Sequence, residues 1–184
     1  MLKERTKAMF AQALLQTMET KELSKVRVLE LCRLCGTDRQ TFYYHFRDKY
    51  DLVAWIYESD LQDTFLSAHN TPSREQTEFL LCRLQRRQSF YSKAFQDMTQ
   101  NSLFAYMHTA NCRITEALAI ERVGGRALTE KERFSIHFVS YAWVCTIAEW
   151  INNRCTPAPE IFADYLFSNH VFAHPGFLEA SGEK

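Results

Sequence analysis

The sequence predicts an all-α fold, with a three-helix unit at the N-terminus followed by a larger helical bundle. Apolar residues recur at spacings of three and four along most of the chain, which is the period of a helix with one buried face. No strand-rich region and no internal repeat is visible. The chain has 184 residues, of which 46% are hydrophobic and 14% aromatic, so it can bury a substantial core. We expect domains at residues 1–50 and 51–174, and a tail at 175–184.

The first fifty residues predict three helices, of which the last two form a helix-turn-helix. The first helix, from about residue 3 to 19, has a buried stripe at Phe10, Ala13, Leu14 and Met18. The second carries its apolar residues at Val28, Leu31, Cys32 and Cys35. Gly36 then stands where a tight turn needs positive φ, and Asp38 is placed to cap the third helix.

The third helix is predicted to lie on DNA. Phe42 and Phe46 stand four residues apart, so they share one face, which we expect to enter the core. The opposite face carries Arg39, Gln40, Tyr43 and Tyr44. Their long donors and phenols can reach base edges in a groove and the phosphates beside it.

The rest of the chain is divided by recognisable start and stop signals. A fourth helix from about residue 48 to 67 links the two domains, and residues 69–72 read as a linker. Ser73 with Gln76, and Thr129 with Glu132, have capping-box spacing and open further helices. Gly124 and Gly125 break the chain, as does the proline-containing segment 156–159. The last two helices are expected over residues 130–153 and 160–170.

The helix-turn-helix and the start of the next helix carry a pattern made of Gly36, Asp38, Thr41, Phe42, Tyr43, His45, Phe46, Lys49 and Leu52. At these positions the chain resembles the TetR family of transcriptional regulators. Within the family, the run from 39 to 46 and the later aromatic helices most resemble the subgroup that includes the regulator of dihydroxyacetone-kinase operons. The resemblance implies an N-terminal DNA-binding domain and a C-terminal helical bundle for dimerisation and effector binding.

Residue by residue, the resemblance implies two kinds of DNA contact. It assigns phosphates to Thr41, Tyr43, His45 and Lys49, and base edges to Arg39, Gln40 and Tyr44. Arg27 stands where the family often has a Ser or Thr that caps the second helix. We therefore expect this cap to shift to Ser24 and Arg27 itself to reach phosphate.

One surface of the body is expected to bind a second subunit. The helix over 130–153 is apolar nearly all round and must be covered on two sides, by the body and by the next helix or a second subunit. TetR-like proteins dimerise through this helix pair, which implies a homodimer on a pseudo-palindromic double-stranded DNA operator. The expected interface residues are Trp143, Ile147, Trp150, Ile151, Phe162 and Leu166.

The body is rich in aromatic side chains, and two interpretations of them stay open. They are core, as aromatic stripes at helical spacing usually are, or they line a ligand cavity as the resemblance implies. The candidate cavity residues are Phe79, Tyr91, Phe95, Phe104, Met107, His108, His137 and Tyr141. The aromatic set also includes Phe134 and Phe138. The effector is an unknown small molecule or a partner protein.

Charge is unevenly placed, although the formal net charge is zero. Residues 1–57 contain 10 Lys or Arg against 7 Asp or Glu, whereas residues 58–184 contain 12 against 15. A modest basic excess suits phosphate contacts whose affinity falls with salt. A solvated charged surface without a partner fits these charges almost as well. A helical module that binds a protein or metabolite, and whose helix-turn-helix no longer binds DNA, is therefore the competing hypothesis.

Several other classes of protein are disfavoured. Cys32 and Cys35 form a CxxC, but a structural zinc site needs four ligands and no second close Cys or His pair with ligand spacing follows, so we expect core cysteines and no metal. No phosphate loop or nucleophile elbow is visible, so we expect neither an enzyme nor a cofactor. The longest apolar window, about 11 residues, is shorter than the ~20 needed to span a bilayer. The N-terminus lacks a secretory signal, so we expect a cytoplasmic protein without a membrane partner.

Overall fold

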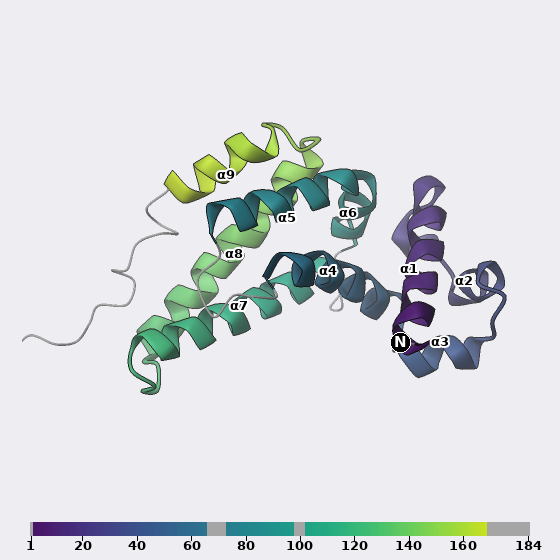
Figure 1. Cartoon of the computed structure of the whole chain (residues 1–184), viewed down its shortest axis with the longest axis horizontal. Helices are drawn as coiled ribbons and strands as arrows, with labels where there is room; N and C mark the ends of the chain where they lie inside the picture. Colours follow the sequence, from purple (N-terminus) through teal and green to yellow (C-terminus); the bar gives the residue numbers. More distant parts are fainter. Residues whose placement is uncertain (1, 66–72, 98–101, 169–184) are drawn as a thin grey trace, which may run out of the picture.

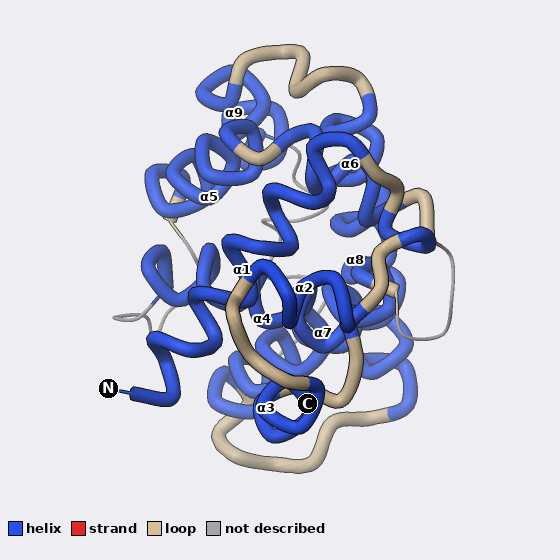
Figure 2. Tube along the Cα trace, turned by 90° about the vertical axis from the view of Figure 1, so that its right-hand side faces the viewer, coloured by secondary structure: helices blue, strands red, loops and turns tan. Residues whose placement is uncertain are grey.

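The computed structural model describes residues 2–65, 73–97 and 102–168, and every regular element in these ranges is helical (Figure 2). The elements are α1 (Leu2–Thr20), the 3₁₀ turn η1 (Leu23–Lys25), α2 (Val28–Leu34), α3 (Arg39–His45), α4 (Lys49–Phe65), α5 (Arg74–Arg86), α6 (Gln88–Phe95), α7 (Leu103–Arg122), α8 (Glu130–Asn152) and α9 (Pro159–Ser168). The predicted all-α fold is confirmed. The predicted linker at 69–72 and tail at 175–184 lie outside the described residues.

The helices α1 to α3 form a head at one end of the molecule (Figure 1). Its centre is a group of aromatic rings that meet edge to face. The Phe10 ring lies 5.2 Å from Phe42 and 6.4 Å from Phe46, at interplanar angles of 85° and 86°. Phe42 is fully buried, as its spacing from Phe46 predicted. The head is thus held by side chains from α1 and from the helix-turn-helix together.

Local signals in the sequence set several helix boundaries correctly. Both predicted capping boxes form, at Ser73 with Gln76 and at Thr129 with Glu132. Gly124 and Gly125 adopt positive φ of 71° and 83° and end α7 before the turn into α8. These groups satisfy backbone donors and carbonyls that the ends of a helix leave without partners.

The body is a layered bundle into which α4 projects from the head (Figure 1). Helix α4 packs against α5 and α7, α7 forms an antiparallel hairpin with α8, and α9 covers α5. One continuous apolar core includes Leu14 of α1, Ile56 of α4 and Val144 of α8. Among the described helices, none combines the length and apolar character that crossing a membrane requires.

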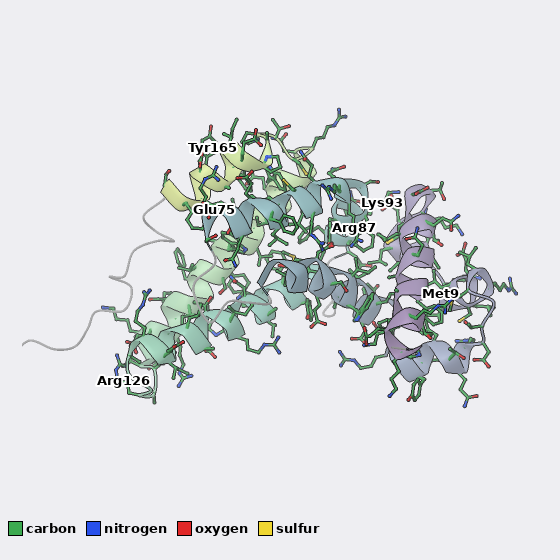
Figure 3. All side chains as sticks on the ribbon, in the orientation of Figure 1. Met9, Glu75, Arg87, Lys93, Arg126 and Tyr165 are labelled. Carbon is green, nitrogen blue, oxygen red and sulfur yellow. The ribbon has the colours of Figure 1, made fainter. Side chains whose placement is uncertain are left out.

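Two lysines fasten the head to the rest of the chain through backbone carbonyls. Lys93 of α6 donates to the carbonyl oxygens of Met18 and Glu19 at the end of α1, at 2.6 and 3.0 Å (Figure 3). Lys49 at the start of α4 donates to carbonyls of and beside η1. A cation at a helix C-terminus both fills orphan carbonyls and complements the helix dipole.

Candidate functional site

The turn before α3 has the geometry that the sequence predicted. Gly36 has a φ of 61°, in the left-handed region that glycine tolerates without strain. Asp38 caps α3, accepting bonds from the Thr41 backbone N at 2.7 Å and from Thr41 Oγ1 at 2.9 Å. These bonds lower the pKa of the Asp38 carboxyl below its usual value. The carboxylate therefore stabilises the start of α3, and the Thr41 hydroxyl is engaged in that cap.

The outer face of α3 presents the predicted base-reading side chains to solvent. Arg39, Gln40, Tyr43 and Tyr44 are exposed, and Tyr44 is 67% accessible. The Arg39 guanidinium lies 5.9 Å from the centre of the Tyr43 ring and donates from Nη2 to its hydroxyl at 3.4 Å. The structure thus brings long donors and phenols together on one convex ridge.

Two lysines of α1 extend this surface, and sequence reasoning missed both. Lys3 Nζ lies 5.2 Å from the centre of the Tyr44 ring. Lys7 Nζ lies 5.8 Å from the Trp55 ring. Burial of His45, together with the charges of Lys7 and Lys3, lowers the pKa of its imidazole. This shift favours the neutral imidazole, which can offer a phosphate one N–H donor rather than a positive charge.

Lys49 lies in a setting that differs from the expected one. Its ammonium donates to the carbonyl oxygens of Leu23 at 2.7 Å, Ser24 at 3.0 Å and Val26 at 3.2 Å. An ammonium has three donors, and these carbonyls engage all of them. Partial burial lowers the pKa of Lys49. A phosphate could reach this lysine only if bonds that hold η1 were broken.

Arg27 is exposed at the start of α2, and its side chain makes no cap bond. The prediction that Ser24 caps α2 is wrong, because Ser24 lies inside η1 and α2 begins only at Val28. Arg27 instead borders a shallow concave surface between η1 and α2. Its lining is Lys21, Lys25, Arg27, Leu29, Glu30, Arg33 and Leu34. The basic excess of the first 57 residues indicated that a basic surface exists in this region, but it did not indicate which residues form it.

The eight predicted pocket residues do not form one cavity. Tyr91, Phe95 and Met107 are buried in the main core, which supports the simpler interpretation for these three. Phe79 is exposed on α5 beneath the Arg83 guanidinium. The other four, Phe104, His108, His137 and Tyr141, gather between α7 and α8.

A cleft that sequence reasoning missed lies between α4 and α7, where the head joins the body. Its volume is about 320 Å³. Its lining is Arg47, Asp48, Tyr50, Asp51, Ala54, Ser102, Ala105, Tyr106 and Thr109. None of the eight predicted pocket residues borders it. Because one wall is α4, the helix that links head and body, a molecule bound here would contact the joint itself.

The α7–α8 hairpin brings together two imidazoles and a thiol. Cys112 Sγ lies 3.5 Å from His108 Nε2 and 3.5 Å from His137 Nδ1. The two imidazole rings are 5.5 Å apart, and the Tyr141 ring stacks on His108 at 3.8 Å. Burial and the neighbouring His137 lower the pKa of His108. Cys112 was predicted only as a core residue, although its spacing of four from His108 was visible in the sequence.

The predicted dimer residues are mostly inside the protomer. Ile147, Trp150, Ile151, Phe162 and Leu166 are buried within the protomer, which contradicts their assignment to the interface, whereas Trp143 is half-buried and stays a predicted interface residue. The Trp150 and Phe162 rings stack at 5.0 Å, because α9 folds back over the end of α8. The exposed apolar side chains of α8 and α9 are instead Phe134, Phe138, Tyr141, Ile161 and Tyr165. Tyr165 extends outward from α9 in Figure 3.

A buried carboxylate joins three helices of the body. Asp60 of α4 is 3% exposed and accepts two bonds of 2.9 Å from Arg87, which follows α5. Arg83 lies 3.6 Å away, and the Tyr91 hydroxyl of α6 donates to Asp60 at 2.5 Å. Arg87 projects toward α4 in Figure 3. A buried charge survives only with such partners, so displacing α4 from α5 and α6 would be costly.

Comparisons with known proteins agree with this architecture. The model of a transcriptional regulator C-terminal region, from the TetR group, matches residues 73–169, which is more than half of the chain. The HTH-type dhaKLM operon transcriptional activator DhaS of Lactococcus lactis subsp. lactis (strain IL1403) is 28% identical over 91 residues. That match spans 49% of this chain and 49% of the relative, about half the length of each.

A solved structure extends the likeness to nearly the whole fold. The dihydroxyacetone kinase operon activator DhaS superposes with a TM-score of 0.61 over 91% of this chain and 94% of its own, at 19% identity. At this identity the likeness concerns the fold. Both named relatives agree with the subgroup that the sequence resembles. With the family model matching most of its body, the chain belongs to the TetR family of transcriptional regulators.

Proposed function

We propose that this regulator binds a specific double-stranded DNA operator through α3 and acts as a homodimer. The observation that carries the proposal is the two-sidedness of α3. Phe42 anchors the helix in the head, while Arg39, Gln40 and Tyr44 are exposed on the opposite side of a helix whose start Asp38 caps. A helix presented in this way fits the major groove, where base edges carry distinct donor and acceptor patterns.

The roles of the individual side chains follow from their surroundings. Arg39 can offer guanine a bidentate fork, and Gln40 can pair with adenine. Tyr44 completes the base-reading set. Tyr43, His45 and Arg27 supply phosphate contacts, as does Thr41 if its hydroxyl turns from Asp38 while the backbone bond keeps the cap. Lys49 positions α4 against η1 through its carbonyl bonds.

The exposed aromatic side chains of α8 and α9 support dimerisation through a different set of residues from the one expected. Phe134 and Phe138 are 70% and 56% accessible and stack on each other. Tyr165 of α9 is also exposed. Pairing two copies through these helices would cover the apolar surface. It would also present two α3 helices to half-sites about one DNA turn (~34 Å) apart.

The cleft between α4 and α7 is the candidate binding site for a small-molecule effector. Its volume of about 320 Å³ lies at the low end of the ~300–1,000 Å³ range of small-molecule sites. An occupant that favours one position of α4 would shift the spacing of the two heads. A partner protein on the body could act on the same helix. Because the two named relatives are operon activators, activation is the output to test first.

The test is fluorescence anisotropy with a duplex from upstream of the protein's own gene and a scrambled duplex, across a salt series. Preferential binding that weakens as salt rises is the expected result, because phosphate contacts release counterions. Failure to bind either duplex at low salt would reject DNA binding. It would favour the competing hypothesis, a helical module that binds a protein or metabolite. A reporter placed behind the bound sequence would then distinguish activation from repression.

A further inference from the structure

The α7–α8 hairpin contains a cluster of potential metal ligands that plays no part in the proposed DNA contact. His108 and Cys112 are four residues apart on α7, so they share one helix face. His137 reaches them from α8, and the ligand atoms of all three residues lie within 4.8 Å of one another. Such convergence depends on the pairing of the hairpin as well as on the spacing within α7.

Two of the three distances between ligand atoms in the cluster match those around a tetrahedral ion. Zinc lies about 2.3 Å from a thiolate and about 2.0–2.1 Å from an imidazole nitrogen, so tetrahedral angles place sulfur and nitrogen about 3.6 Å apart. Cys112 Sγ lies 3.5 Å from His108 Nε2 and 3.5 Å from His137 Nδ1. Two edges of the ligand triangle therefore have the required length before any ion is bound.

The surroundings supply a rigid inner wall and an open entrance. Cys112 is buried in a small apolar cluster with Ala119, Leu128 and Ile136. The Tyr141 ring stacks on His108 at 3.8 Å and restrains its imidazole. His137 is exposed, so an ion can enter from its side and small adjustments of that ring can complete the triangle.

We propose that His108 Nε2, Cys112 Sγ and His137 Nδ1 bind a thiophilic divalent transition ion, with zinc the first choice and a fourth position open to solvent. One thiolate and two imidazoles suit zinc better than magnesium or calcium, which prefer oxygen ligands. Binding M²⁺ to the Cys112 thiol forms an M–S bond and releases one proton to solvent, while both imidazoles bind as neutral ligands. The ion would link α7 to α8 in the middle of their hairpin.

Cobalt(II) is the probe, because its spectrum reports both ligand type and geometry. Tag-free full-length protein, first stripped with a chelator, is titrated with Co²⁺ alone. The expected result is one equivalent of binding, with visible d–d bands of tetrahedral intensity and a thiolate charge-transfer band, all removed by Zn²⁺. Cys112→Ser should abolish the charge-transfer band. Removing a group that only hydrogen-bonds to a metal ligand typically costs about 10–100-fold in metal affinity. His137→Gln removes a ligand itself, so it should weaken Co²⁺ binding by more than about 100-fold.

Controls separate the proposed site from other thiols and from a folding defect. Cys145→Ser removes an exposed thiol of α8, the helix that carries His137, and should leave the spectrum unchanged. His137→Gln alters an exposed side chain, so its far-ultraviolet circular dichroism should match the parent's and keep the test valid if Cys112→Ser misfolds. Unchanged Co²⁺ spectra and affinity in His137→Gln would overturn the proposal. So would a spectrum that is lost only in Cys32→Ser, or no Co²⁺ binding by the parent protein.

Discussion

The outer face of α3 and the outer face of α8 both expose aromatic rings, but the neighbours of these rings differ. Tyr43 and Tyr44 of α3 lie beside the cationic groups of Arg39 and Lys3. Phe134 and Phe138 of α8 lie beside each other, with ring centres 6.4 Å apart. Cations and phenols suit a polyanion, whereas stacked phenyl rings suit an apolar partner. Exposure alone therefore says little about the kind of partner, and the neighbouring groups decide it.

The largest expected effect is on the core that supports α3. Phe42→Ala should lower the free energy of unfolding by about 3–5 kcal/mol, because the Phe42 ring is fully buried against Phe10 and Phe46. Chemical denaturation followed by circular dichroism measures the change. Tyr44→Ala on the exposed side of α3 is the control, expected within ~0.5 kcal/mol of the parent. Equal losses in both variants would refute the two-sidedness of α3.

The next effect concerns the apolar partner proposed for α8. Phe138→Glu places a charge in the proposed dimer interface and should weaken self-association by about 2 kcal/mol or more. Light scattering across a dilution series should show a monomer at concentrations where the parent is a dimer. Phe79→Glu on α5 is the matched control, since Phe79 is exposed but lies on another surface. A Phe138→Glu protein that stays dimeric would exclude this face.

Base reading by α3 should depend on the geometry of one guanidinium. Arg39→Ala should cost about 1–3 kcal/mol on the preferred operator and relax discrimination at one base position. Arg39→Lys keeps the charge but lacks the bidentate fork, so it should retain non-specific affinity and still lose discrimination. Anisotropy against a set of single-base operator variants separates the two effects. Unchanged preference in both proteins would remove Arg39 from the base-reading set.

Substitution of two lysines near the head should change two different quantities, the salt dependence of DNA binding for Lys3 and the thermal stability for Lys49. Lys3→Met removes an exposed cation beside Tyr44 and should reduce the slope of log K against log salt by about 0.9 for each protomer of the dimer. Lys49→Met removes the carbonyl bonds that hold η1, so it should lower Tm while leaving that slope near the parent value. Salt titrations and thermal melting test the pair. A slope change confined to Lys49→Met would restore Lys49 as a phosphate contact.

The smallest expected effect is the pH response at the turn that positions the α8 face. Arg126 and the Thr129 backbone lower the pKa of Glu132 to about 2. Because the folded pKa lies below the unfolded value of about 4.3, this contribution is fully present above the unfolded value and is lost as pH falls through about 2. The difference in Tm between the parent and Glu132→Gln should therefore shrink as pH falls from about 4.3 to about 2. Glu130→Gln, at an exposed position in the same turn, should show a smaller difference in Tm.

The sequence predicted local geometry well, because local signals act through neighbouring residues. Gly36, Asp38 and the two capping boxes fix turns and helix starts by chemistry within a few positions. The same reasoning placed Phe42 in the core and Arg39 outside. Ser24 failed as a cap because η1, which periodicity did not reveal, occupies that stretch.

Tertiary pairing was harder to predict, because an all-round apolar helix does not indicate which neighbour covers each side. Trp150 and Ile151 were assigned to a second subunit, yet other helices of the same chain bury them. Phe138 was assigned to a core or a cavity and is exposed. Cys112 meets His137 only through the register of the α7–α8 hairpin, which no spacing within one helix specifies.

Lys93 and Lys49 hold the head by oxygen atoms that every amino acid carries. The acceptors are main-chain carbonyls of Met18, Glu19, Leu23, Ser24 and Val26. The lysine bonds themselves therefore do not depend on which side chains stand here, although Met18, Leu23 and Val26 are also buried in the apolar core that head and body share. A head from a relative could therefore keep both lysine attachments if it follows the same backbone path and places apolar side chains where Met18, Leu23 and Val26 stand.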